Sequence, residues 1–150
     1  MRLVIQRVKE ASVTIDGRLH SSIGPGLFIL VGVEVGDTRE DVSWLVSKTA
    51  GLRIFDDEDG VMNRNVIDAG GELLAVSQFT LTASTRKGNR PSYARAAGHE
   101  LAIPLYEDYC RLLCEAAGRP VRQGVFAAEM QCSLINDGPV TIIIDSRLRE

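Results

Sequence analysis

The chain has 150 residues, of which 45% are hydrophobic and 25% are charged, and its formal net charge is −3. These values favour one compact domain over residues 1–150, and they exclude the broad, non-specific nucleic-acid binding that needs many phosphate contacts. No apolar run approaches the ~20 residues of a membrane span. Three cysteines without close pairs do not indicate a disulfide framework, and the short apolar start is interrupted too soon for a signal peptide. We therefore expect a cytoplasmic protein with no membrane contact.

The first part of the chain predicts short strands joined by turns. Apolar alternation and apolar runs place these strands at residues 3–8, 12–15, 18–22 and 27–33. Asp16-Gly17 is typical of a two-residue hairpin turn. The nearly unbroken apolar run over 27–33 is expected of a strand that is covered on both faces.

Two amphipathic helices are predicted. Apolar residues at helical spacing indicate the first helix over residues 38–50. Pro104 suits the first turn of the second helix, and its apolar stripe continues to residue 117. Gly118 and Pro120 then provide the end of this helix. Its two cysteines, Cys110 and Cys114, have no nearby histidine, so we interpret them as packing residues and expect no metal site.

The remaining apolar segments complete the expected fold. Further strands are predicted at residues 52–55, 72–76, 121–126, 130–135 and 140–144. The acidic segment 56–60 lacks the ligand spacing of a calcium loop, so we read it as solvated. The resulting order predicts an α+β domain with mixed, mostly antiparallel sheets, barrel-like or sandwich-like, and two main helices packed on them.

Asn136-Asp137-Gly138-Pro139 separates two of these predicted strands. One interpretation is a tight hairpin turn, because glycine tolerates positive φ and proline fixes its own φ. The other is a rigid backbone device in which a ligand approaches Gly138 closely and Pro139 follows a cis peptide bond, at a cost of about 0.5–1 kcal/mol. Such a pair would present two carbonyl oxygens in a fixed direction and could read the handedness of a small molecule.

Ser77-Gln78-Phe79-Thr80-Leu81 follows another apolar strand, at a place where side chains and free backbone groups can meet a ligand. The hydroxyls of Ser77 and Thr80 would need a neighbouring base to act as nucleophiles, and the two histidines of the chain stand in no recognisable triad pattern. We favour backbone N–H groups that stabilise an oxyanion, with Gln78 and Phe79 lining the pocket. Phe79 could stack on a base, although buried aromatic side chains are more often core.

The polar segment 82–95 reverses the charge of the acidic chain, since it contains Arg86, Lys87 and Arg90. An ordinary solvated loop is one interpretation. The other is a phosphate-contacting patch beside the pocket. The local reversal of charge favours the patch.

The two motifs, in this order, are accompanied by further characteristic segments along nearly the whole chain. These are Ile5-Gln6-Arg7-Val8, Gly24-Pro25-Gly26-Leu27, Leu52-Arg53-Ile54-Phe55, Gly70-Gly71-Glu72-Leu73-Leu74, and Lys87-Gly88 before Arg90-Pro91-Ser92. Together they resemble the D-aminoacyl-tRNA deacylase family of the D-tyrosyl-tRNA deacylase type. The combination is specific, whereas either motif alone would mean little.

This resemblance implies hydrolysis of the ester between a D-amino acid and tRNA, and also of glycyl-tRNA, by a homodimer without metal or organic cofactor. Gly138 and Pro139 of one subunit would reach into the pocket of the other and reject L-amino acids by clash with a rigid backbone. Glycine has no side chain to exclude and would pass. Arg7, which spacing alone assigns to a solvated strand edge, would hold the Gly-Pro pair in place.

The resemblance also assigns the pocket. The catalytic segment would comprise Ser77, Gln78, Phe79 and Thr80, acting mainly through main-chain atoms, with the 2′-hydroxyl of the terminal adenosine in place of a protein base. That adenosine would be enclosed by Phe126 and Met130, and the RNA 3′ end would meet Arg86, Lys87 and Arg90. Ala127 stands where the family usually has glycine. Its methyl group could narrow the adenosine side of the pocket or pack outward.

Two other functions fit the same residues. A non-catalytic nucleic-acid-binding dimer on this fold would use the 82–95 loop and would bind duplexes with steep salt dependence. A hydrolase acting on a small ester through Thr80 would lose its activity in Thr80→Ala with a substrate that lacks tRNA.

Overall fold

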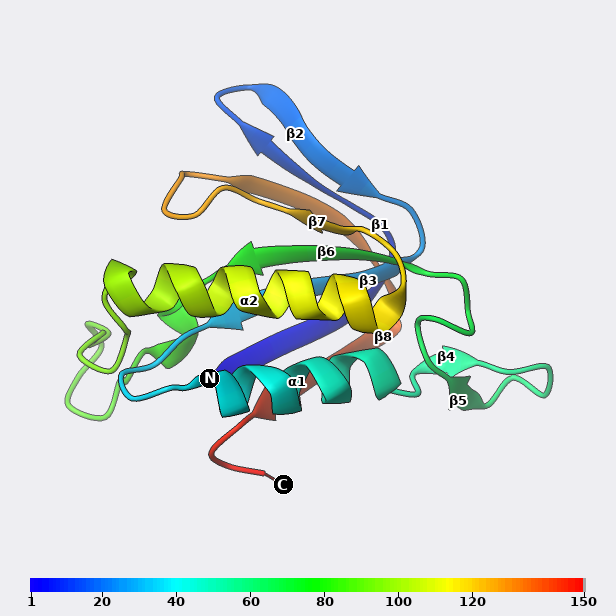
Figure 1. Ribbon diagram of the computed structural model, residues 1–150. Helices are drawn as coiled ribbons and strands as arrows, with labels where there is room; N and C mark the ends of the chain where they lie inside the picture. Colours follow the sequence, from blue (N-terminus) through cyan, green and yellow to red (C-terminus); the bar gives the residue numbers. More distant parts are fainter. Residues whose placement is uncertain (150) are drawn as a thin grey trace.

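A computed structural model describes residues 1–149 and shows two helices lying side by side against one face of a curved sheet (Figure 1). The elements in chain order are β1 (Arg2–Ile15), β2 (Arg18–Ile23), β3 (Gly26–Gly32), α1 (Arg39–Gly51), β4 (Phe55–Asp56), β5 (Met62–Arg64), β6 (Glu72–Ser77), the 3-10 turn η1 (Phe79–Thr82), α2 (His99–Ala117), β7 (Val121–Gln123) and β8 (Gln131–Asp145). The predicted α+β class, with a mixed sheet and two main helices, is confirmed.

The large sheet is organised around β1. Its strand order is β2-β1-β3-β6-β7, and β8 pairs with the other side of β1. β1 is antiparallel to β2, β3 and β8, whereas β3–β6 and β6–β7 are parallel. The parallel pairs bring the carboxyl ends of β3 and β6 to the same edge, where ligands commonly bind in such sheets. A separate small sheet contains β4 and β5.

Both long strands differ from the prediction of shorter ones. Residues 3–8 and 12–15 belong to one strand, because β1 keeps its pairing to β8 through two register shifts between Gln6 and Glu10. Residues 130–135 and 140–144 likewise fall almost entirely within β8, which does not reverse direction at Gly138-Pro139. The interpretation of this segment as a hairpin turn is therefore wrong, since both halves of β8 pair with the same strand.

The core occupies both faces of the sheet, as the apolar run of β3 predicted. Leu27 and Ile29 belong to the larger cluster beneath the helices, while Phe28 belongs to a second cluster on the other face. This split follows from the alternation of side chains along a strand. The two helices are joined by a buried hydrogen bond of 2.9 Å between the Thr49 and Tyr109 hydroxyls.

The helix boundaries agree with the sequence at three of four ends. α1 begins with a capping box formed by Thr38 and Asp41, and α2 ends before Gly118 at φ +63°. However, α2 begins at His99, so Pro104 lies in its second turn and not in its first. Pro104 is the sixth residue of α2, so the helix lacks the hydrogen bond that an N–H at this position would donate to the Glu100 carbonyl. The carbonyl of Gly98 accepts hydrogen bonds from Leu101 and Ala102 and so starts the helix earlier.

Two predicted strands are shorter or shifted. The β7 strand covers only 121–123, and residues 124–130 form a loop that leads to β8. The strand predicted at 52–55 begins only at Phe55 and pairs with β5 across the acidic turn. Within residues 1–149, neither helix combines the length and the apolar character that crossing a membrane would require.

Candidate active site

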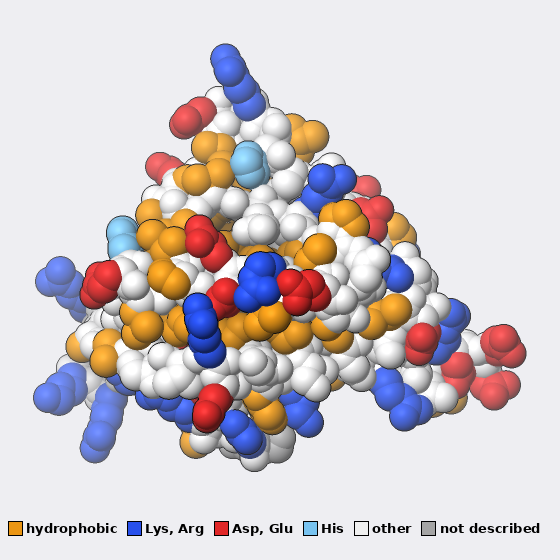
Figure 2. Space-filling view, viewed as in Figure 1, with side chains coloured by type: hydrophobic (Ala, Val, Ile, Leu, Met, Phe, Trp, Pro, Cys, Tyr) orange, Lys and Arg blue, Asp and Glu red, His pale blue; other side chains and the backbone are white. Residues whose placement is uncertain are grey.

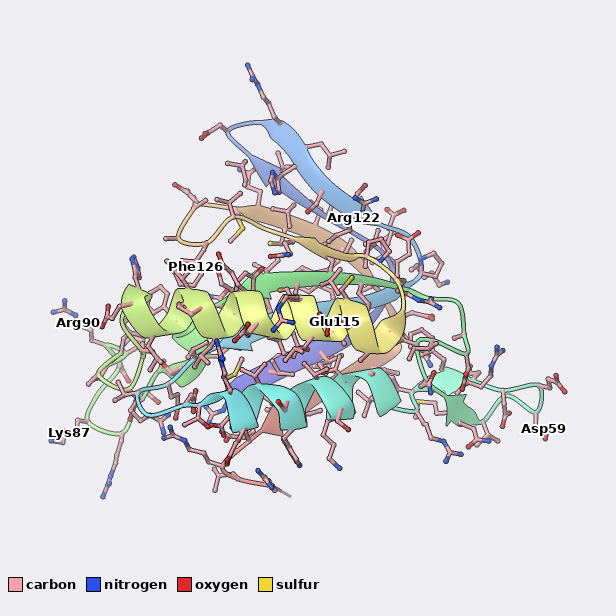
Figure 3. All side chains as sticks on the ribbon, viewed as in Figure 1. Asp59, Lys87, Arg90, Glu115, Arg122 and Phe126 are labelled. Atoms are coloured by element: carbon pink, nitrogen blue, oxygen red, sulfur yellow. The ribbon has the colours of Figure 1, made fainter. Side chains whose placement is uncertain are left out.

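A cavity of about 610 Å³ lies at the carboxyl ends of β3 and β6, beside the N-terminus of α2. The loop after β7 and the start of β8 close its other side. Its walls include Val31, Val76, Ser77, Gln78, Phe79, His99, Ala102, Tyr106, Phe126, Ala127, Met130 and Cys132. Figure 3 shows Phe126 near the N-terminal end of α2, on the side of β6 and β7. A cleft of this size, largely apolar with a few polar groups, is typical of a small-ligand site.

The cavity brings together five residues that the sequence assigned to the site. These are Ser77, Gln78, Phe79, Phe126 and Met130. Thr80 does not line it, and its hydroxyl accepts a hydrogen bond from the Gln78 side-chain amide. Phe79 is 56% exposed, so the interpretation of this ring as core is wrong.

The main chain of the Ser77–Leu81 segment offers a specific pair of donors. The N–H of Gln78 is used, since it donates to the Val31 carbonyl at 2.7 Å. The N–H groups of Phe79 and Thr80 are the first two of η1. The first N–H groups of a helical turn have no acceptor within that turn, so these two are suited to hold a negatively charged oxygen.

Two cavity residues escaped the sequence analysis. Tyr106 lines the cavity but donates its hydroxyl to the Ala75 carbonyl at 3.0 Å, and burial raises its pKa well above the ordinary value. His99, which fits no triad pattern, packs edge-on against Phe126 with ring centroids 5.4 Å apart. His99 could have been assigned to the cavity only by knowing that α2 begins at this residue and not near Pro104.

Ala127 adopts a left-handed backbone conformation, with φ +61°, at the wall of the cavity. This conformation favours glycine, because the Cβ of other residues crowds the backbone there. The glycine that the resemblance leads us to expect here would therefore suit the backbone geometry better than alanine does.

The Gly138-Pro139 pair lies in an outward bulge of β8. Gln6 pairs with Thr141 and Val8 pairs with Asn136, so four residues of β8 stand opposite Arg7 alone. The peptide bond between Gly138 and Pro139 is cis, and Gly138 has φ +124°. A Cβ on Gly138 would lie 2.9 Å from Val140 Cγ2, so only glycine fits without a shift.

Arg7 anchors this bulge from within the sheet. It is 8% exposed, so the assignment to a solvated strand edge is wrong. Its Nε donates to the Asp137 carbonyl at 3.2 Å, and its Nη1 donates to the Ile54 carbonyl at 2.6 Å. The guanidinium also pairs with the carboxylates of Asp56 at 3.5 Å and Asp137 at 3.4 Å. A planar group with several donors can hold these acceptors at once.

The bulge and the cavity are separate within one chain. Gly138 and Pro139 are exposed, and neither they nor Arg7 are among the residues that line the cavity. The exposed basic residues Arg86, Lys87 and Arg90 lie outside it too, in a loop closed by two 2.9 Å hydrogen bonds between Ser84 and Ser92. Figures 2 and 3 show basic side chains projecting into solvent at the end of the molecule where Lys87 and Arg90 are labelled.

Known proteins resemble this chain from end to end. Residues 4–145 match the family model described as D-Tyr-tRNA(Tyr) deacylase. The chain is 60% identical to the D-aminoacyl-tRNA deacylase of Parabacteroides distasonis and 61% identical to that of Porphyromonas gingivalis, with 100% of both chains covered in each comparison.

Solved structures with the same fold include a c-Myc DNA unwinding element binding protein, with a TM-score of 0.92 and 40% identity over 97% of this chain and 98% of that one. A probable eukaryotic D-amino acid tRNA deacylase has a TM-score of 0.81 over 95% of this chain and 97% of that one, and at 15% identity it shows the shared fold alone. The family model and the full-length relatives together show that this chain belongs to the D-Tyr-tRNA(Tyr) deacylase family.

Proposed function

We propose that this protein is a D-aminoacyl-tRNA deacylase, a hydrolase that cleaves the ester between a D-amino acid, or glycine, and the 3′ end of tRNA. Residues 1–150 act as one catalytic domain. The observation that supports this proposal most directly is the cavity, where the strand end at Ser77, Phe79 and Phe126 meet beside the first N–H groups of η1. The family membership and the full-length relatives of the same name support this substrate class.

The chemistry proceeds through the main chain and the substrate. Water attacks the ester carbonyl carbon, the carbonyl oxygen becomes negatively charged, and the N–H groups of Phe79 and Thr80 stabilise it. The carbon–oxygen bond to the ribose then breaks, and the 3′-oxygen leaves with a proton. The 2′-hydroxyl of the same ribose replaces the missing protein base, because it accepts the proton that the attacking water loses and passes its own proton to the leaving 3′-oxygen. Thr80 supports the segment through its hydrogen bond from Gln78 and is not the nucleophile, since it does not line the cavity.

The chiral filter is the Gly138-Pro139 bulge of a second subunit. The bulge is exposed, it is braced by Arg7, and it does not line the cavity of its own chain. In a homodimer it enters the partner's cavity and leaves no room for the side chain of an L-amino acid. Ile135 and Ile143 of β8, which are 52% and 67% exposed, support an interface along this strand.

The RNA end occupies the other walls. Phe126 and Met130 enclose the terminal adenosine, and Arg86, Lys87 and Arg90 contact phosphates of the acceptor strand. The protein acts in the cytoplasm, where its free thiols Cys110, Cys114 and Cys132 would stay reduced.

The decisive experiment compares deacylation of D-tyrosyl-tRNA, L-tyrosyl-tRNA and glycyl-tRNA by the purified protein. We expect hydrolysis of the D-ester and the glycyl ester, with the L-ester released only at the rate of the uncatalysed reaction. Equal rates on both tyrosyl esters, or no cleavage of any, would refute the proposal.

A second candidate is a nucleic-acid-binding dimer without catalysis. It is favoured by one observation, the 40% identity and close structural match to a c-Myc DNA unwinding element binding protein. Steep salt-dependent binding of duplex DNA, with no deacylation, would select it. A small-ester hydrolase that uses Thr80 has less support, because that hydroxyl neither lines the cavity nor is free.

A further inference from the structure

Two exposed aromatic side chains, Phe79 and Tyr93, meet beside the cavity. They are 56% and 40% exposed, their ring centroids lie 5.0 Å apart, and their planes are inclined by 66°. Phe79 forms part of the cavity wall, whereas Tyr93 belongs to the segment that returns from the basic loop. The proposed chemistry uses only the main chain of Phe79, so both rings are left without a role.

The loop next to this aromatic pair is anchored. Ser84 and Ser92 exchange two backbone hydrogen bonds of 2.9 Å, which close the loop directly before Tyr93. The Tyr93 carbonyl then accepts a hydrogen bond of 2.9 Å from Ala96. The backbone at Tyr93 is therefore fixed between the closed loop and Ala96, which lines the cavity.

Charge indicates what would cover the two rings. Residues 84–92 contain Arg86, Lys87 and Arg90 and no acidic residue, in a chain whose net charge is −3. Figure 3 shows Lys87 and Arg90 extending outward from this loop. Aromatic surfaces beside exposed cations are the combination with which proteins bind unpaired nucleotides, because bases stack on the rings while the cations contact phosphates.

We propose that Phe79 and Tyr93 form a stacking platform for the base of the unpaired nucleotide directly 5′ of the terminal adenosine. The inference rests on the proposed function, since it requires that the cavity hold the terminal aminoacyl nucleoside. The next base toward the 5′ end leaves the cavity past Phe79 and stacks on the pair, and the preceding phosphates continue toward Arg86 and Arg90. Stacking tolerates any base, so the platform adds affinity for an unpaired end without reading its sequence.

The test uses two probes that cannot be hydrolysed. One is D-tyrosine joined by an amide to 3′-amino-3′-deoxyadenosine, and the other is the same group at the end of an RNA hairpin with an unpaired 3′ strand. Tyr93→Ala should weaken binding of the RNA about tenfold and leave binding of the nucleoside unchanged. Removing the penultimate base from the RNA should cost the wild-type protein about tenfold and the variant nothing further.

Two further variants serve as controls. Tyr93→Phe keeps the ring and should bind both probes as the wild-type protein does, which separates stacking from the hydroxyl group. Leu19→Ala removes an apolar side chain that is 67% exposed on β2, and it should change neither affinity.

The platform is overturned if removing the penultimate base weakens RNA binding equally in the wild-type protein and in Tyr93→Ala. It is also overturned if Tyr93→Ala loses as much affinity for the nucleoside as it loses for the RNA. It is also overturned if Tyr93→Ala and Phe79→Leu convert a dimer to monomers, since the rings would then contact a second copy. If the wild-type protein binds the nucleoside, and binds the abasic RNA as tightly as the complete RNA, the platform alone is refuted. No binding of either probe by wild type refutes the proposed function as well.

Discussion

The cavity and the Gly138-Pro139 bulge are built by opposite means. The cavity lies where two parallel strands end, and its polar groups are main-chain N–H groups freed at the start of a short 3-10 turn. The bulge interrupts an antiparallel pair, and a buried arginine fixes it through carbonyl groups. The cavity provides space and hydrogen-bond donors for a ligand, whereas the bulge provides a segment of backbone that is fixed in position. In the proposed dimer each region supplies half of a site, so neither would explain chiral selection alone.

Replacing Gly138 should have the largest effect, because it alters the bulge at the place where we propose that it meets the substrate. In Gly138→Ala the added Cβ would lie 2.9 Å from Val140 Cγ2 and 3.2 Å from Arg7 Nη2, at a φ of +124°. The backbone must shift, and we expect D-tyrosyl-tRNA deacylation to fall about 100-fold. Gly17→Ala is the matched control, since Gly17 also has positive φ but no neighbour within 4 Å. Similar losses in both variants would mean that backbone strain, and not the bulge, is responsible.

Arg7→Lys tests whether the brace is needed. A lysine cannot reach the carbonyl groups of Ile54 and Asp137 together, so buried acceptors lose their donor. We expect the free energy of unfolding in urea to fall by about 2 kcal/mol and deacylation to fall with it. Arg18→Lys, at an exposed position of β2, should change neither. Full activity in Arg7→Lys would show that the bulge keeps its shape unaided.

The basic loop should affect binding more than chemistry. Replacing Arg86, Lys87 and Arg90 by glutamine should raise the KM for tRNA about tenfold, with kcat little changed. The slope of the logarithm of the binding constant against the logarithm of the salt concentration should become shallower by about three. The control makes the same charge change at the exposed residues Lys9, Arg18 and Arg122. Equal effects of both triple variants would show that only net charge matters.

Ala127→Gly should produce the smallest change, and in the opposite direction. Glycine removes the strain of the left-handed conformation at φ +61°, which should raise the free energy of unfolding by about 1–2 kcal/mol. The greater conformational freedom of glycine in the unfolded chain should lower it by about 0.4–1 kcal/mol. We therefore expect a net rise in the free energy of unfolding of about 0.5 kcal/mol. Ala128→Gly, whose position has no positive φ, should instead lower it. A loss of stability in both variants would contradict this reading of Ala127.

The sequence predicts what local patterns determine. The nearly unbroken apolar run of β3 indicates a strand that is covered on both faces, and Gly118 marks the end of α2. At Gly138-Pro139 the hairpin interpretation fails, because pairing of both halves with β1 keeps the chain extended, whereas the cis peptide bond of the other interpretation is present. The sequence also fails at Arg7, because burial of that side chain depends on acceptors 47 and 130 residues away. Such contacts leave no periodic signal.

The site shows the same division. The Ser77–Leu81 motif identifies three of the cavity residues and the family resemblance adds Phe126 and Met130, whereas His99 and Tyr106 come from a helix face that looks like ordinary packing. The exposure of Phe79 and its contact with Tyr93 follow from how the 82–95 loop closes, which composition does not indicate.

The central claim is that each working site combines the cavity of one chain with the bulge of another. It is tested by mixing two variants that we expect to be inactive, Gly138→Ala and Ala128→Trp. The tryptophan would fill the cavity from the loop between β7 and β8. After random reassembly of equal amounts, half of the dimers are mixed and each contains one intact cavity facing one intact bulge, so deacylation of D-tyrosyl-tRNA should return to about a quarter of the wild-type rate. If the mixture of the two variants stays inactive although mixed dimers form, cavity and bulge do not meet across subunits and the account is wrong.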